Sequence, residues 1–82
     1  MFTVYILYSD LHHKIYIGYT SNMQERLLSH NQLATKGYTI KFRPWRIIHT
    51  ETFDTKAIAM KREKELKSAQ GRKFVWSLIN KE

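Results

Sequence analysis

Two tyrosines, one arginine and one histidine lie close together near the start of the sequence. Tyr5 and Tyr16 belong to two short aromatic segments, and Arg26 and His30 follow them four residues apart. Side chains four apart on a helix project from one face, so Arg26 and His30 are expected to point the same way. An arginine fork pairs well with phosphate and stays charged. The group therefore suits a phosphodiester substrate.

Hydrolysis of a phosphodiester needs a base that takes a proton from the attacking water. It also needs a positive group close to the negatively charged phosphoryl oxygens. A tyrosine has an unperturbed pKa of ~10, so it acts as a base only beside a cation or a proton acceptor such as Arg26 or His30. Glu63 could hold one Mg²⁺ that keeps most of its waters. Taken singly, each residue also has an ordinary interpretation. Strand tyrosines are usually core residues, and Glu63 has Lys67 at i+4 as a helix partner.

Two predicted strands position the tyrosines. Residues 2–8 carry apolar side chains on both faces, which is typical of a central strand. A short polar connection leads to a second strand at residues 15–19, so we expect a hairpin with Tyr5 and Tyr16 at corresponding points. Gly18 near the end of the second strand indicates a bulge or a close approach of the backbone.

The arginine and histidine belong to a predicted helix. Residues 20–22 are all of helix-capping type, and Ser21 with Gln24 has the spacing of a capping box. The helix is expected to run to about Asn31. A polar loop is predicted over residues 31–44.

The second half of the chain predicts one strand and two helices. Residues 45–53 read as the third strand. A helix capped at residues 54–55 runs to about Ala69, Gly71 stops it, and a short helix follows at residues 72–81. Together these elements predict one α+β domain spanning residues 1–82, with a small three-stranded antiparallel sheet flanked by helices.

The longer helix has an apolar stripe at ~100° per residue. Glu63 lies at the edge of this stripe, and Arg62 lies nearer its centre, for which the sequence offers no reason. The stripe consists of Ile58, Ala59, Leu66 and Ala69. The final helix is expected to close the core with Phe74, Leu78 and Ile79.

The composition excludes several classes of protein. The 43% of apolar residues argues against disorder, and the absence of cysteine leaves no disulfide framework or thiolate metal site. No apolar run approaches the ~20 residues that span a bilayer, so no membrane partner is expected. The first residues lack the basic segment of a signal peptide, which makes the cytoplasm the expected location.

The net charge of +7 is placed unevenly. Residues 1–35 are balanced, whereas residues 36–82 hold twelve Lys and Arg against five acids. Such a distribution suits nucleic acid, because neutralising phosphates releases counterions, although a basic surface can also serve solubility alone. The candidate nucleic-acid contacts are Lys36, Lys41, Arg43, Lys67, Arg72 and Lys73.

The sequence resembles the GIY-YIG nuclease superfamily, and in particular its small single-domain members, over nearly its whole length. The first signature is similar to Thr3-Val4-Tyr5, with the initial Gly and Ile replaced, and the second is intact as Tyr16-Ile17-Gly18. Further similarity lies in Gly37-Tyr38-Thr39, in Arg43-Pro44-Trp45 and in the run from Ala59 to Lys64.

The resemblance implies the same α+β fold and a divalent-metal nuclease site using Mg²⁺ or Mn²⁺. By matching positions it implies Tyr5 and Tyr16 near the scissile phosphate, Arg26 as phosphate clamp, His30 as proton partner and Glu63 as the sole protein metal ligand. Many relatives also carry a late active-site asparagine, and the late asparagine of this sequence is Asn80.

The favoured interpretation is an endonuclease acting on nucleic acid, on DNA rather than RNA, in repair or recombination. A rival is a nucleic-acid-binding module that keeps the fold without cleaving, and a third is a protein-interaction domain. A pure binder has no need of Glu63, which repels phosphate unless a metal intervenes. In the endonuclease interpretation, a protein partner would select the nucleic-acid target.

Overall fold

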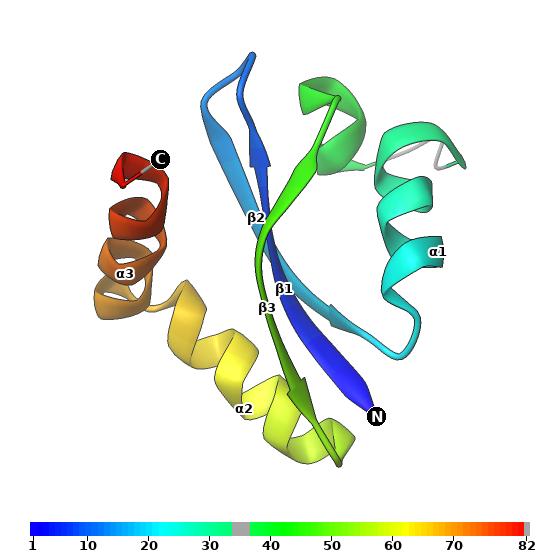
Figure 1. Ribbon diagram of the computed structural model, residues 1–82, viewed down its shortest axis with the longest axis vertical. Coiled ribbons are helices and arrows are strands. Elements are labelled where there is room, and N and C mark those ends of the chain that lie inside the picture. The colour runs from blue at the N-terminus through cyan, green and yellow to red at the C-terminus, as the bar shows by residue number, and fades with distance from the viewer. Residues whose placement is uncertain (34–36, 82) are drawn as a thin grey trace.

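A three-stranded antiparallel sheet forms the centre of the computed structural model, which describes residues 1–33 and 37–81 (Figure 1). The central strand is β1 (Phe2–Ser9). It pairs with β2 (Lys14–Thr20) on one side and with β3 (Arg46–Phe53) on the other. The α+β fold and the central place of the first strand are therefore confirmed.

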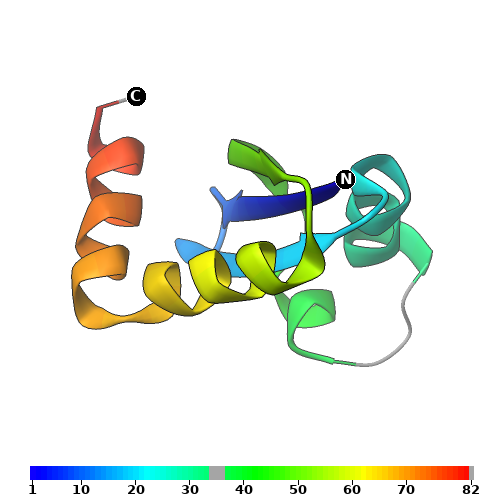
Figure 2. The same cartoon turned by 90° about the horizontal axis from the view of Figure 1, so that it is seen from below.

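Helices cover both faces of the sheet. They are α1 (Met23–Leu28), a π-helical turn η1 (Ser29–Leu33), a 3₁₀ helix η2 (Tyr38–Phe42), α2 (Lys56–Lys67) and α3 (Ala69–Asn80). Figure 2 shows α2 running along the sheet, with α3 at one end of the molecule and α1 at the other. No helix among the described residues is long and apolar enough to cross a membrane.

The core consists of two clusters, because successive side chains of β1 point to opposite faces. One cluster is formed by Val4, Ile6, Ile17, Ala59, Leu66 and Val75, and so joins the sheet to α2 and α3. The other is formed by Tyr5, Leu7 and Trp45, with Met23 and Leu27 of α1 packed against it. The second cluster places the Tyr5 side chain on the face that α1 covers.

The hairpin register differs from the expected one. Tyr5 lies opposite Gly18, and Tyr16 lies opposite Leu7, so the two tyrosines are diagonal neighbours on one face. Their ring centroids are 6.2 Å apart with planes at 27°. The register follows from the turn, where the backbone N–H of His13 donates to the carbonyl of Ser9 at 2.7 Å. The sequence did not predict this turn geometry.

The start of α1 is capped by Asn22, not by the expected Ser21–Gln24 box. The Asn22 side chain accepts from the backbone N–H of Glu25 at 3.1 Å and donates to the Glu25 carboxylate at 3.4 Å. Only the first half of a capping box is formed, because the backbone N–H of Asn22 donates to Oγ1 of Thr20 at 3.1 Å and not to the Glu25 carboxylate. The α-helix ends at Leu28 and continues as η1 toward the predicted end.

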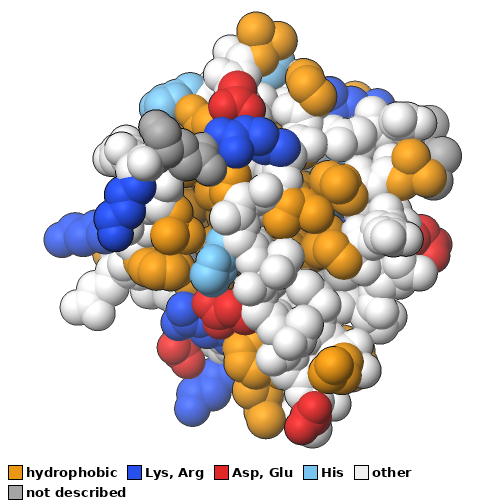
Figure 3. Space-filling model, viewed as in Figure 1, with side chains coloured by type: hydrophobic (Ala, Val, Ile, Leu, Met, Phe, Trp, Pro, Cys, Tyr) orange, Lys and Arg blue, Asp and Glu red, His pale blue; other side chains and the backbone are white. Residues whose placement is uncertain are grey.

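An ion pair with β3 explains why Arg62 lies near the centre of the apolar stripe. Its Nε and Nη2 donate to the two carboxylate oxygens of Glu51 at 2.8 and 3.1 Å. At the other end of β3, Arg46 pairs with Asp10 at 2.7 Å. Figure 3 shows basic and acidic side chains interspersed over the face seen in Figure 1, so this face carries no single basic field.

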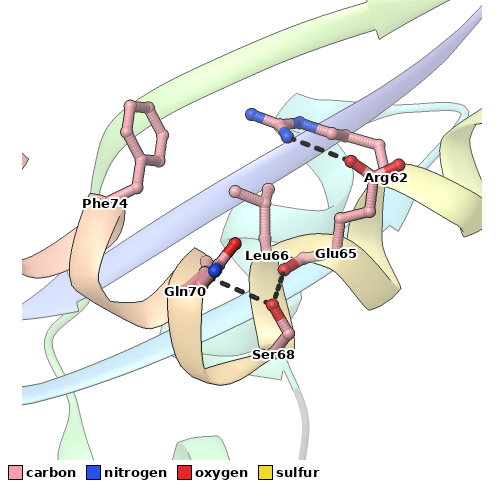
Figure 4. A pocket seen from close by; sticks show the side chains of 7 residues that line it. Arg62, Glu65, Leu66, Ser68, Gln70 and Phe74 are labelled. Atoms are coloured by element: carbon pink, nitrogen blue, oxygen red, sulfur yellow. Dashed lines mark hydrogen bonds and ion pairs between the residues drawn. The ribbon is translucent and has the colours of Figure 1, made fainter.

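Ser68 separates α2 from α3, where Gly71 had been expected to stop the helix. Ser68 ends α2, and its Oγ accepts from the backbone N–H of Gly71 at 3.2 Å as the N-cap of α3 (Figure 4). Gly71 lies inside α3, where a Cβ would overlap the backbone of Glu65 and Leu66. The glycine therefore permits the close approach of the two helices, and the predicted end at Ala69 is wrong by two residues.

The earlier start of α3 also changes which residues it buries. Val75 is fully buried, and Leu78 and Ile79 pack against the same cluster as expected. Phe74 is 37% exposed, and its ring contacts the ring of His49 and the guanidinium of Arg62 instead of closing the core. In α2, Ala59 and Leu66 are buried, but the expected stripe member Ile58 is exposed. Thr55 caps α2 as predicted.

Candidate active site

Residues from four elements surround one hollow beside the edge strand β2. It measures about 360 Å³ and is lined by Tyr5, Tyr16, Gly18, Tyr19, Thr20, Arg26 and Glu63. Four of the five candidate catalytic residues thus meet there, one from each of β1, β2, α1 and α2. The fifth, His30, contacts the hydroxyl of Tyr5.

Tyr5, Arg26 and His30 form one hydrogen-bonded group. The Tyr5 side chain is 1% exposed, and its hydroxyl lies 2.9 Å from Nε2 of His30. Nε of Arg26 donates to the same hydroxyl oxygen at 3.4 Å. Because the oxygen accepts from Arg26, its hydrogen is directed to His30. We therefore assign Nε2 of His30 as the unprotonated nitrogen of a neutral imidazole.

The surroundings favour this uncharged pair. Burial lowers the pKa of His30 to about 4, and the nearby charges of Arg26 and Arg43 act in the same direction. Burial also raises the pKa of Tyr5, and this outweighs the opposing hydrogen bond from Arg26. At neutral pH Tyr5 therefore keeps its proton, and His30 is uncharged with the lone pair of Nε2 facing the Tyr5 hydroxyl.

Gly18 makes room for the Tyr5 hydroxyl. A Cβ at this position would lie 2.6 Å from the Tyr5 hydroxyl oxygen and 3.1 Å from Cε1 of Tyr16. Both values are below ordinary van der Waals contact, so any larger residue would displace the tyrosines. The close approach expected from the sequence is confirmed, whereas the register shift of the sheet lies elsewhere, between β1 and β3.

Glu63 is the acidic residue of the hollow. Its side chain is 19% exposed, and Oε1 accepts from Nζ of Lys67 at 3.3 Å. Oε2 has no hydrogen-bond partner within residues 1–33 and 37–81. The same residues contain no cluster of three His, Cys, Asp or Glu that could hold a metal. Glu63 therefore fits a cation that needs one protein carboxylate and takes water and phosphate oxygens as its other ligands, as Mg²⁺ does.

Arg43, expected on the nucleic-acid surface, supports the histidine from behind. Its Nε donates to the carbonyl of His30 at 2.6 Å and its Nη2 to the carbonyl of Ser29 at 3.3 Å. Asn31 bonds the backbone N–H and carbonyl of Trp45 at 2.6 and 2.9 Å. These contacts tie η1 to the start of β3. Sequence reasoning missed Asn31, because its partner is fourteen residues away in a loop without periodicity.

The remaining candidates lie apart from this hollow. Lys41 is exposed on η2, and Arg72 and Lys73 are exposed on α3. Asn80 is an exposed residue at the end of α3. None of these four lines the hollows that Arg26 borders. Lys36 lies outside the residues that the structure describes.

A second hollow adjoins the first, because Tyr16 and Arg26 line both. It measures about 300 Å³, and its other walls are Ser29, His30, Gly37, Tyr38 and Thr39. Tyr38 was not among the candidate site residues. A larger hollow of about 460 Å³ lies between α2 and α3, around Arg62, Glu65 and Phe74 (Figure 4), and it contains no candidate catalytic residue.

Comparisons of the sequence with known proteins point to one family. The family model of the GIY-YIG catalytic domain matches residues 1–75. A UPF0213 protein of Natronomonas pharaonis is 42% identical over 65 residues, which are 79% of this chain and 75% of that protein. A UPF0213 protein of Staphylococcus saprophyticus is 39% identical over 54 residues, 66% of either chain.

A solved structure of another UPF0213 protein is also similar to this chain. The solution NMR structure of a UPF0213 protein from Bacillus halodurans superposes with a TM-score of 0.56 at 32% identity, covering 95% of this chain and 85% of that one. The family match begins before the two tyrosine strands and runs past Glu63 of α2, so it includes every element that contributes to the hollow. The chain belongs to the GIY-YIG catalytic domain family.

Proposed function

We propose that the protein is a divalent-metal-dependent endonuclease that hydrolyses phosphodiester bonds in DNA. The observation that carries the proposal is the convergence of Tyr5, Tyr16, Arg26 and Glu63 on one hollow. The family is one of nucleases, which supports phosphodiester hydrolysis as the reaction class. A role in DNA repair or recombination is part of the proposal.

Arg26 and Glu63 are the charge-stabilising groups of the proposed mechanism. Arg26 lies at the meeting point of the two hollows, where its fork can pair with two phosphoryl oxygens of the scissile group. Glu63 would hold Mg²⁺ or Mn²⁺, which when bound neutralises charge on the phosphoryl and leaving oxygens. Tyr16 borders both hollows, and its hydroxyl orients the attacking water or the phosphate.

Tyr5 and His30 carry the proton in the proposed mechanism. As a water oxygen attacks phosphorus, its proton passes to the Tyr5 oxygen, and the Tyr5 proton passes to Nε2 of His30, 2.9 Å away. The transfer needs no free phenolate, which agrees with the raised pKa of Tyr5. The low pKa of His30 makes the resulting imidazolium a strong acid, so that it readily returns the proton.

A binding module without activity is the alternative. Glu63 argues against it, because a carboxylate in a hollow that contains Arg26 repels phosphate when no cation intervenes. The ion pair with Lys67 offsets only part of this repulsion, since the Lys67 side chain is half exposed.

The test is cleavage of labelled DNA and RNA substrates in single-stranded, nicked, flap and duplex form, with Mg²⁺, Mn²⁺ or chelator. Glu63→Gln should abolish metal-dependent cleavage, roughly a hundredfold loss or more. It should preserve the fold and leave metal-free binding unchanged or tighter, because one negative charge near the phosphate is removed.

Glu65→Gln is the matched control. Glu65 lies on the same helix, more exposed than Glu63 and outside the Tyr5 hollow. Its variant should cleave at the wild-type rate. Unchanged turnover in Glu63→Gln would refute the metal site, and failure of the wild type to cleave any substrate in the panel would favour the binding module.

A further inference from the structure

An exposed aromatic ring forms one wall of the second hollow. Tyr38, the first residue of η2, is 48% exposed, although its ring lies against those of Phe42 and Trp45 at centroid distances of 4.8 and 6.3 Å. These contacts hold the ring in place from behind. An aromatic side chain that is fixed on one side and open on the other is suited to stacking against a flat ligand.

Tyr38 also continues a row of rings that begins at the catalytic tyrosine. Tyr5 and Tyr16 lie 6.2 Å apart, Tyr16 and Tyr38 lie 6.4 Å apart, and both pairs have planes at 27°. The row leads from the buried Tyr5 to the exposed Tyr38. A flat group on Tyr38 would therefore lie beside the proposed position of the scissile phosphate.

The charges around Tyr38 favour a phosphate-linked ligand. Among the described residues, the walls of the second hollow include Arg26 and no acidic side chain. Lys41 is exposed three residues after Tyr38 on the same 3₁₀ helix. Side chains at i and i+3 of a 3₁₀ helix project in the same direction, so the ammonium group and the ring face the same side. A flat ring between two cations matches one nucleobase with a phosphate on either side.

We infer that Tyr38 is a stacking platform for one unpaired nucleobase adjacent to the scissile phosphate, with Lys41 holding the phosphate beyond that base. The inference rests on the proposed function, since both use the same pair of hollows. The base must be unpaired, because both faces of a paired base are covered by its neighbours in the duplex. Tyr38 would thus select strands with an unpaired nucleotide at the cleavage position.

The inference is tested by metal-free binding of the full chain carrying Glu63→Gln. The probes are a single-stranded DNA oligonucleotide and its duplex, each with one 2-aminopurine, at one fixed salt concentration. Tyr38→Ala should weaken single-strand binding roughly tenfold or more and duplex binding less than about twofold. Tyr38→Phe should retain both the affinity and the 2-aminopurine quenching that reports stacking.

Two further variants keep the test decisive. Tyr38→Leu preserves apolar bulk without an aromatic face, so it should behave as Tyr38→Ala, and it replaces that variant if circular dichroism shows Tyr38→Ala to be unfolded. Phe74→Ala removes a similarly exposed ring outside both hollows and should change nothing. Equal losses for single strand and duplex, no loss at all, or full binding by Tyr38→Leu would overturn the inference.

The inference and the proposed function fail in different ways. Cleavage by the wild type together with Tyr38-independent binding overturns the stacking platform and leaves the nuclease standing. Tyr38-dependent single-strand binding without metal-dependent cleavage overturns the nuclease and leaves the base-binding subsite standing. If neither the single-stranded probe nor the duplex probe binds, the inference is overturned.

Discussion

A neutral histidine beside a protonated tyrosine is the central feature at the scale of single residues. His30 is 5% exposed, and its burial together with the charges of Arg26 and Arg43 lowers its pKa to about 4. Arg43 engages its backbone carbonyl and Arg26 the hydroxyl of Tyr5. Both arginines therefore disfavour the protonated form of His30 while they contact the groups on either side of its ring.

The buried histidine should make folding stability depend on pH. Unfolded His30 takes up a proton near pH 6.5 and folded His30 only near pH 4, so the unfolded state binds more protons between these values. Stability should thus be complete above about pH 6.5 and fall as the pH drops toward 4, by at most about 3 kcal/mol from this residue. Urea unfolding across this range measures the effect.

His30→Gln isolates this contribution. The glutamine does not titrate, so the variant should be less stable at neutral pH but should lose less stability on acidification than the wild type. His12→Gln, at an exposed position in the hairpin turn, is the control and should keep the wild-type pH dependence. If the free energies of unfolding of wild type and His30→Gln fell in parallel on acidification, the predicted linkage would be contradicted.

At the scale of elements, the rotation of α2 about its axis decides where Glu63 points. Arg62 and Glu63 are consecutive and therefore project about 100° apart. Arg62 is held to Glu51 of β3, and Glu63 faces the hollow beside β2, at the opposite edge of the sheet. The ion pair on one side of the helix therefore positions the carboxylate on the other.

Loss of this ion pair should impair the site through the helix. Arg62→Met keeps most of the side-chain bulk but removes the bidentate contact to Glu51. We expect a stability loss of about 1 kcal/mol, because the pair is only partly exposed. Metal-dependent kcat should fall while metal-free DNA affinity stays within about twofold, because Arg62 lines none of the hollows that Arg26 borders.

The double variant Arg62→Met, Glu51→Leu tests the cause. It removes the carboxylate left without its arginine and should recover stability without recovering kcat. Lys64→Met, an exposed lysine on the same helix, is the control and should change neither quantity. Wild-type kcat in Arg62→Met would show that the ion pair does not position Glu63.

At the scale of the whole molecule, the excess of basic residues is larger than the charge available for nucleic acid. Arg46, Arg62 and Lys67 are each within 4 Å of a carboxylate, and Arg43 donates to backbone carbonyls. A phosphate contact by one of these would compete with an existing partner. The exposed Lys41 has no carboxylate or carbonyl partner among the residues that the structure describes, and it is the better candidate.

The salt dependence of DNA binding should reveal this difference. Each phosphate contact contributes about −0.9 to the slope of log K against log salt for duplex DNA and about −0.7 for single strands. For single-stranded DNA, Lys41→Gln should therefore make the slope shallower by about 0.7, whereas Arg46→Gln should leave it nearly unchanged because Asp10 already holds Arg46. Titrations from low to physiological salt measure both. Equal changes in the two variants would contradict the distinction.

Features that depend on local periodicity could be predicted from the sequence. Alternation of apolar residues on both faces of β1 predicted a central strand, and Gly18 predicted a close backbone approach. The spacing of Arg26 and His30 placed them on one side of a helix, and both do contact Tyr5. These predictions succeeded because strand and helix periods act over a few neighbouring residues.

Arrangements that join distant segments could not be predicted in this way, because they depend on how the elements pack. The diagonal register of the tyrosines depends on the geometry of one turn, and the role of Arg43 depends on carbonyls thirteen and fourteen residues away. Arg62 interrupts an apolar stripe, and its reason is the carboxylate of Glu51 on a neighbouring strand. Tyr38 reads as one more aromatic residue in a loop until packing leaves its ring exposed above Tyr16. Pairings of this kind leave no period in the sequence, because packing and charge, not chain spacing, select the partner.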